Sequence, residues 1–136
     1  MTASSVSSGA GVVRWWRVVT ILLAGAVFTQ AIFAGAILSG EAWAHAAHSM
    51  TAIALVAATT VAGLVSLVTL RRVSSGTKLG LTLLALAAAL LLQMALGKWS
   101  ADGANLMWVH VPLGVALVGL AAQAVTVASH LGARNA

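Results

Sequence analysis

The sequence contains no cysteine. This absence excludes disulfide bonds, metal sites built on thiolates, cysteine nucleophiles and the covalent attachment of c-type haem, which needs a C-x-x-C-H motif. Proline is nearly absent as well, and the one proline, Pro112, is expected in the first turn of a helix, where its missing N–H costs little. Any metal or cofactor in this protein must therefore be held without thiolates.

Charged residues are also scarce. They make up 7% of the chain, against about 25% in soluble domains, and only Glu41 and Asp102 are acidic. The chain therefore offers few of the side chains that are used in catalysis by paired carboxylates or in metal centres built on carboxylates. Hydrophobic residues make up 61% of the chain, above the roughly 45–50% that is usual in soluble proteins. This balance excludes a soluble globular domain.

The hydrophobic residues form four continuous segments of about the length that crosses a hydrocarbon core of roughly 30 Å. The segments are residues 18–38, 48–70, 79–96 and 106–128. Their apolar runs do not alternate as barrel strands do, and alanine and leucine, which favour helices, dominate them. The sequence predicts an all-α integral membrane protein, a four-transmembrane-helix bundle made of two repeated helical hairpins.

The charges divide between the two sides of this topology. One side holds Lys98 and both carboxylates; the other holds six cations, Arg14, Arg17, Arg71, Arg72, Lys78 and Arg134. Because short cytoplasmic loops carry an excess of Lys and Arg, both termini are expected in the cytoplasm. This topology accounts for the net charge of +5 without nucleic acid. Residues 1–13 are expected to form a disordered tail, and residues 14–136 a single transmembrane domain.

The two halves of the chain resemble each other. The Gln30 segment QAIFAG aligns with QMALG at Gln93, and the His48 segment HSMTAIAL aligns with HVPLGVAL at His110. Arg72 lies 24 residues after His48, and Arg134 lies 24 residues after His110. If the hairpins are related by a pseudo-twofold axis along the membrane normal, the two histidines have equal depth on facing helices.

Two imidazoles on facing helices are what axial coordination of a planar haem requires. The expected cofactor is one haem b near the outer face, with His48 and His110 as iron ligands. Ala52 and Gly114, one turn after each histidine, would leave room for the porphyrin. Lys98 would neutralise a propionate.

Other polar residues have simpler interpretations. His45 also fits a W-x-H match with His110 and is the alternative ligand on the second helix. His130 is expected at the cytoplasmic end of the last helix, where a histidine is favourable. Gln30 and Gln93 are expected to form hydrogen bonds between helices, and the glycines, including Gly35 and Gly97, to permit close helix packing. Trp43, Trp99 and Trp108 are expected in an interfacial aromatic belt.

These motifs resemble one four-helix half of the haem A synthase family and are similar to small bacterial four-helix membrane proteins with the same pattern. The resemblance covers about residues 28–120: a Gln/Gly motif ends the first helix, a histidine opens the second, Q-x-x-L-G ends the third and H-x-P-L-G-x-A-L opens the fourth. It implies b-type haem between His48 and His110 and a place in a bacterial plasma membrane. That family has two such halves, and this chain corresponds to one.

The leading functional prediction is a small b-type cytochrome that transfers electrons without an open site at the iron. A quinone, another haem protein or a larger respiratory complex would be its redox partner, in a lipid bilayer, and a homo-oligomer is compatible with this function. One alternative is a non-redox accessory or scaffold protein. Another is copper binding at the outer face by His45, His48 and Met50, because imidazole and thioether suit copper.

Overall fold

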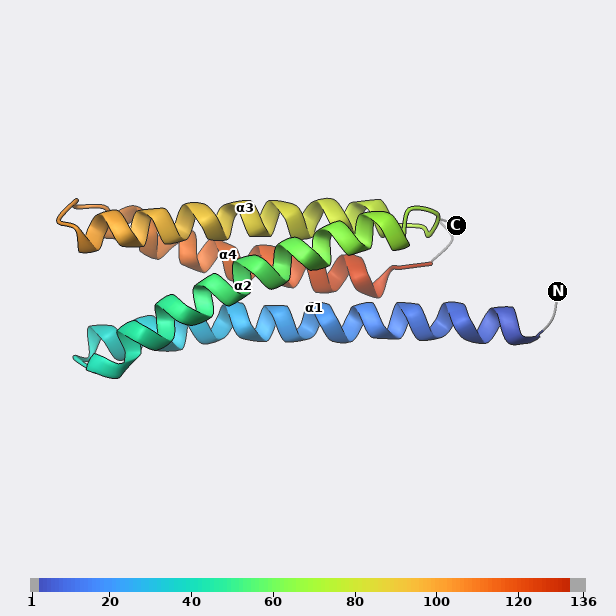
Figure 1. Cartoon of the computed structure of the whole chain (residues 1–136), viewed down its shortest axis with the longest axis horizontal. Coiled ribbons are helices and arrows are strands. Elements are labelled where there is room, and N and C mark those ends of the chain that lie inside the picture. Colours follow the sequence, from blue (N-terminus) through green and yellow to red (C-terminus); the bar gives the residue numbers. More distant parts are fainter. Residues whose placement is uncertain (1–2, 133–136) are drawn as a thin grey trace.

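The computed structural model describes residues 3–132, which form four long helices (Figure 1). The helices are α1 Ala3–Leu38, α2 Ala42–Thr69, α3 Gly76–Ala101 and α4 Met107–Ser129. Each contains a stretch long and apolar enough to cross a membrane, which in α1 is Ala10–Leu38. A helix satisfies its backbone groups internally, as a lipid-exposed segment must. The chain is therefore an all-helical, multi-pass membrane protein.

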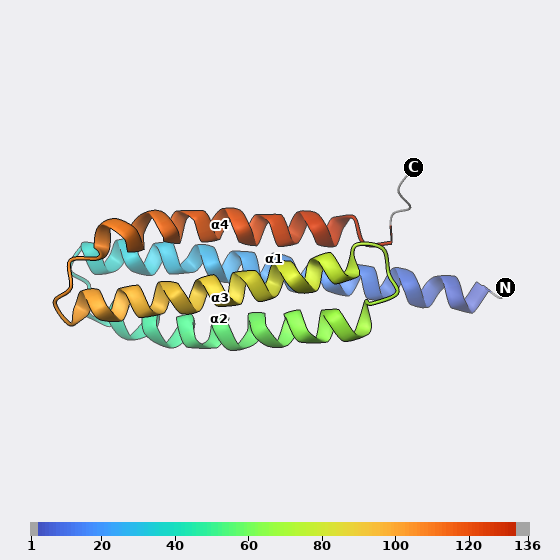
Figure 2. The ribbon, with the colours of Figure 1, turned by 90° about the horizontal axis from the view of Figure 1, so that it is seen from above.

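The helices form a four-helix bundle in which each helix packs against two others. Helix α2 packs against α1 and α3, and α4 packs against α3 and α1, so that α2 and α4 lie diagonally opposite. The start of α1 and the end of α4 lie at the same end, which we call the terminal end (Figure 2). The α1–α2 and α3–α4 connections lie at the other end, which we call the hairpin end (Figure 2).

Helix α2 crosses the bundle obliquely. It lies beside α1 at the hairpin end and beside α3 at the terminal end (Figure 1). Toward the terminal end, glycines let α2 and α3 approach closely. A Cβ on Gly63 would lie 2.9 Å from Leu84, and one on Gly80 would lie 2.6 Å from Leu67. The tilt of α2 therefore depends on small residues where it meets α3.

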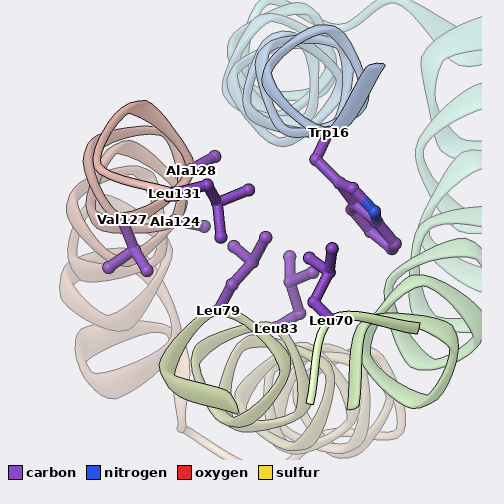
Figure 3. Close-up of a cluster of buried hydrophobic side chains, with 8 residues drawn as sticks. All are labelled: Trp16, Leu70, Leu79, Leu83, Ala124, Val127, Ala128 and Leu131. Carbon is purple, nitrogen blue, oxygen red and sulfur yellow. The ribbon is translucent and has the colours of Figure 1, made fainter. Parts of the chain in front are cut away.

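The buried apolar residues form two clusters. The cluster at the terminal end, shown in Figure 3, draws on all parts of the bundle and comprises Trp16, Leu70, Leu79, Leu83, Ala124, Val127, Ala128 and Leu131. The second lies in the middle of the bundle and comprises Val27, Leu55, Leu86, Leu90, Leu117 and Ala121. Neither cluster extends to the hairpin end, where the predicted haem ligands lie.

The structure separates the charges by end, as the topology prediction requires. The terminal end holds five of the described cations, Arg14, Arg17, Arg71, Arg72 and Lys78, and the hairpin end holds Lys98, Glu41 and Asp102. Arg17 donates a hydrogen bond of 2.7 Å to the main-chain carbonyl of Ser129, which ties α1 to the last turn of α4. Arg134 lies outside the described residues.

Three helices are longer than the apolar segments that predicted them, and α4 has the predicted length, shifted by one residue. Helix α1 begins at Ala3 and so continues through most of the segment expected as a disordered tail; residues 1 and 2 lie outside the described residues. Helix α2 begins at Ala42 rather than at residue 48, which places His48 in its second turn. Pro112 lies in the second turn of α4, not the first. Hydropathy locates the apolar core of a helix, whereas backbone hydrogen bonding continues through flanking polar residues.

Candidate functional site

His110 and Gln93 are joined by two hydrogen bonds between α4 and α3. The Gln93 side chain donates from Nε2 to the main-chain carbonyl of His110 over 2.8 Å. The Nδ1 atom of His110 lies 3.1 Å from the main-chain carbonyl of Gln93, and because a carbonyl can only accept, Nδ1 carries the proton in this bond. The imidazole is thereby fixed in one tautomer, with an electron pair on Nε2.

Two glycines make this arrangement sterically feasible. A Cβ on Gly97 would lie 2.9 Å from Cε1 of His110, so the imidazole rests directly on the backbone of α3. A Cβ on Gly114 would lie 3.1 Å from Nε2 of Gln93. The space at Gly114, which was predicted to admit a porphyrin, is thus occupied by the Gln93 amide. The close contact of Gly97 with the His110 ring was not predicted from the sequence.

His48 projects from α2 at the same end of the bundle and is half-buried. His48 lies in the second turn of α2 and His110 in the first turn of α4, so the structure places both predicted ligands at the hairpin end. The ring of His48 approaches the main-chain carbonyl of Gln30, but Nδ1 is buried and forms no hydrogen bond. Ala52 lies one turn after His48 and is half-buried.

The glutamines connect the helices within each hairpin, as predicted. Gln30 donates from Nε2 to the hydroxyl of Thr51, which joins α1 to α2, as Gln93 joins α3 to α4. Thr51 in turn donates to the main-chain carbonyl of Ala47. In both hairpins the histidine ring lies next to the main-chain carbonyl of the glutamine on the preceding helix. Thr51 carried no signal in the sequence, since threonine is common on membrane helices.

Buried polar atoms without a hydrogen-bond partner gather at the hairpin end. Among the described residues they are Gln30 Oε1, His48 Nδ1, Gln93 Oε1 and Ser100 Oγ. A buried polar atom that lacks a partner costs about 1–3 kcal/mol, and natural proteins contain few of them. Three of the four belong to the two glutamine–histidine pairs, so this region has unused hydrogen-bonding capacity next to both imidazoles.

A groove runs between α1 and α2 beside the Gln30–Thr51 hydrogen bond. Its volume is about 300 Å³, and its walls are almost entirely apolar. Gln30 and Thr51 contribute to it, and the remaining lining residues are Leu23, Ala26, Thr29, Phe33, Ala54, Leu55 and Ala58. The α1–α2 contact is therefore loosely packed around Gln30 and Thr51.

The surroundings of the hairpin end fit an interface with water. Trp43, Trp99 and Trp108 are all exposed there, as predicted for an aromatic belt. Trp43 packs edge-to-face on Phe33 with ring centres 6.1 Å apart, and donates a hydrogen bond to Glu41. Lys98, predicted to neutralise a propionate, forms an exposed ion pair of 3.0 Å with Asp102.

Of the remaining histidines, one lies near this pair, since His45 precedes His48 by three residues on α2, and one lies at the opposite end of the bundle. His45 is exposed at the start of α2. His130 ends α4 at the terminal end, where its Nδ1 donates to the carbonyl of Thr126 over 2.8 Å, in agreement with its predicted role at the helix terminus.

The predicted copper ligands do not converge. Met50 follows His48 by two residues, about 200° around the helix, and is 71% exposed. The described chain also has no group of three or more His, Asp or Glu side chains placed to hold a metal ion. A haem held by two histidines does not need such a group.

Comparison with protein-family models, with curated proteins and with solved structures finds no match to this chain.

Proposed function

We propose that this protein is a small membrane b-type cytochrome that holds one haem between His48 of α2 and His110 of α4. The observation that carries the proposal is the hydrogen bond from Nδ1 of His110 to the carbonyl of Gln93. Histidines that ligate metals commonly donate their other ring N–H to a carbonyl or carboxylate, which orients the ring and leaves the ligating nitrogen free. Nε2 of His110 meets this requirement.

The residues present fit a haem. The two imidazoles lie at the hairpin end of helices that are diagonally opposite and do not pack on each other. A planar group between α2 and α4 would therefore not have to separate two packed helices. The unpaired oxygens of Gln30 and Gln93 border the same region, and the two hairpins share the arrangement of histidine next to glutamine, which supports the internal repeat.

Haem b supplies reversible one-electron transfer between two iron oxidation states. The chain would supply two neutral nitrogen ligands, hold His110 in one tautomer through Gln93, and surround the site with apolar helix. With His48 and His110 both holding the haem, the site would pass electrons and would not bind a substrate. A site at one end of the bundle needs a partner to carry electrons further, and a membrane quinone or a larger haem-protein complex would serve.

The first test is the reduced-minus-oxidised absorption spectrum of the protein purified in detergent. We expect the sharp α-band of low-spin haem b, and we expect His110→Ala to lose most of the haem. His130→Ala is the matched control, because His130 lies on the same helix at the opposite end and should leave the haem content unchanged. A colourless protein from haem-replete cells would refute the proposal.

The ligand on α2 can be identified in the same way. We assign His48, because it is half-buried, whereas His45 is exposed. His48→Ala should therefore abolish the low-spin spectrum, and His45→Ala should leave it unchanged. The opposite result would transfer the ligand role to His45.

A structural scaffold is the second candidate function, and the double hydrogen bond between Gln93 and His110 also favours it. Such a bond holds α3 against α4 whether or not a cofactor is present. In that case the purified protein would be colourless, and His110→Ala would lower its resistance to unfolding while His48→Ala would not.

A further inference from the structure

The two proposed ligands are held to very different degrees. His110 is fixed at three points: its ring nitrogen bonds to the Gln93 carbonyl, its main-chain carbonyl accepts from the Gln93 amide, and its ring rests on Gly97. Any rotation of the imidazole would break the first contact or press the ring against the α3 backbone. The α3–α4 hairpin is thus organised to present His110 before any ligand is bound.

His48 has none of these constraints. Its Nδ1 atom is buried without a partner, although the Gln30 carbonyl is near. The Gln30 amide bonds to the Thr51 side chain rather than to the His48 main chain. Gly35, the glycine that matches Gly97 in the repeat, has no atom within 4 Å of its Cβ position, so it provides no such contact for the ring of His48.

Packing also differs between the two hairpins, and it is looser between α1 and α2 than between α3 and α4. The groove of about 300 Å³ lies between α1 and α2 and includes Gln30 and Thr51, the polar pair next to His48. Beside His110, the atoms of α3 and α4 are instead so close that added Cβ atoms at Gly97 and Gly114 would lie 2.9 and 3.1 Å from them. Regions with few packing contacts open at lower free energy than tightly packed ones. We therefore expect the α1–α2 contact at Gln30 and Thr51 to open at lower free energy than the α3–α4 contact at His110.

We propose that His110 is the permanent iron ligand and His48 an exchangeable one, so that the site accepts a small neutral donor, such as imidazole or carbon monoxide, in place of His48. This inference rests on the proposed haem site. In the exchange, the bond from His48 to iron breaks and a bond from the donor forms, with no change in oxidation state. The protein would then bind small ligands as well as pass electrons.

The test compares His48→Gly and His110→Gly, each loaded with haem in detergent, with and without added imidazole. We expect His48→Gly to keep the haem in a high-spin form and to regain the low-spin spectrum when imidazole is added. We expect His110→Gly to lose the haem and imidazole not to restore it. Reduced wild-type protein should also show the spectral shift of carbon monoxide binding.

The outcomes distinguish failure of this inference from failure of the proposed function. A wild-type protein without haem would refute the proposed function. If the wild-type protein binds haem but the two variants lose it equally, regain it equally or behave in the reverse order, the inference alone is overturned. Failure of the reduced wild-type protein to bind carbon monoxide would overturn it too.

A second pair of variants keeps the test valid if a histidine variant does not fold. Gln93→Leu removes the amide that holds the His110 main chain, and Gln30→Leu makes the same change in the other hairpin. Gln93→Leu keeps the main-chain carbonyl that accepts from Nδ1 of His110 but removes the second bond that holds α4 against α3 at this point. We expect a measurable loss of haem affinity for Gln93→Leu and a smaller one for Gln30→Leu; equal losses would contradict the asymmetry.

Discussion

Gly97 allows the His110 ring to pack directly on α3, because it has no side chain. The His110 ring occupies the space that a Cβ would fill, at 2.9 Å from Cε1. The ring cannot give way freely, because Nδ1 is bonded to Gln93 on the same face of α3. Gly35, the glycine of the matching motif in the first hairpin, has no atom within 4 Å of its own Cβ position. The two glycines therefore have different roles despite the sequence match.

This difference predicts opposite effects for the same substitution. Gly97→Ala should destabilise the bundle by about 1–3 kcal/mol, the usual cost of overpacking, and should weaken haem binding by displacing His110. Gly35→Ala should be neutral or stabilise it by up to about 1 kcal/mol, because alanine favours helix more than glycine does. Unfolding of both variants in a detergent titration, with haem content in parallel, measures the effects. Equal stability of the two would show that the ring is not fixed by Gly97.

The same residues show what the sequence could and could not predict. Two histidines in equivalent places of a repeat were visible from spacing, and the structure brings them to one end of the bundle. The glycine motifs were visible too, but their contacts depend on which faces of α3 and α4 meet. Gly97 and Gly114 are filled by the His110–Gln93 pair, while Gly25, Gly35 and Gly119 meet nothing within 4 Å.

At the scale of elements, α1 is held mainly by its terminal half. Its buried described residues are Trp16, Thr20 and Val27, none of them at the hairpin end. Trp16 reaches from α1 toward Leu70 and Leu83 in the terminal cluster (Figure 3). Toward the hairpin end, α1 meets α2 along the apolar groove and through the Gln30–Thr51 bond. The anchoring of α1 and the proposed haem site therefore lie in separate parts of the bundle.

Adjacent tryptophans on α1 provide a matched test of this anchoring. Trp16 is 5% exposed and Trp15 is 64% exposed. Trp16→Ala should lower stability by about 3 kcal/mol, near the bottom of the range for emptying a core tryptophan site, because lipid receives part of the freed surface. Trp15→Ala should cost much less. Unfolding in detergent measures both, and equal losses would mean that the terminal cluster does not hold α1.

Helix ends were the least predictable part of the fold. The apolar segments located all four helices, because a run of about 20 apolar residues has few other stable conformations in lipid. They did not locate the start of α2, where Ala42–Ala47 precedes the expected boundary. They also could not give the tilt of α2, which follows from the fit of Gly63 and Gly80 against leucines of the facing helix.

At the scale of the whole molecule, the orientation in the membrane decides which compartment the site faces. The described cations gather at the terminal end, apart from Lys98, which is paired with Asp102. Moving several cations across a bilayer is costly, and loops rich in Lys and Arg stay in the cytoplasm. We therefore expect the hairpin end, with His48 and His110, to face the outer side of the membrane.

The absence of cysteine makes this orientation directly measurable, since each introduced cysteine is the only thiol in the chain. Ser74→Cys lies in the α2–α3 connection at the terminal end, and Ala104→Cys lies in the α3–α4 connection at the hairpin end; both positions are exposed. In intact cells, a maleimide that cannot cross the membrane should label position 104 and not position 74. After lysis both should react, which controls for accessibility. Labelling of position 74 alone in intact cells would place the histidines on the cytoplasmic side and require a cytoplasmic redox partner.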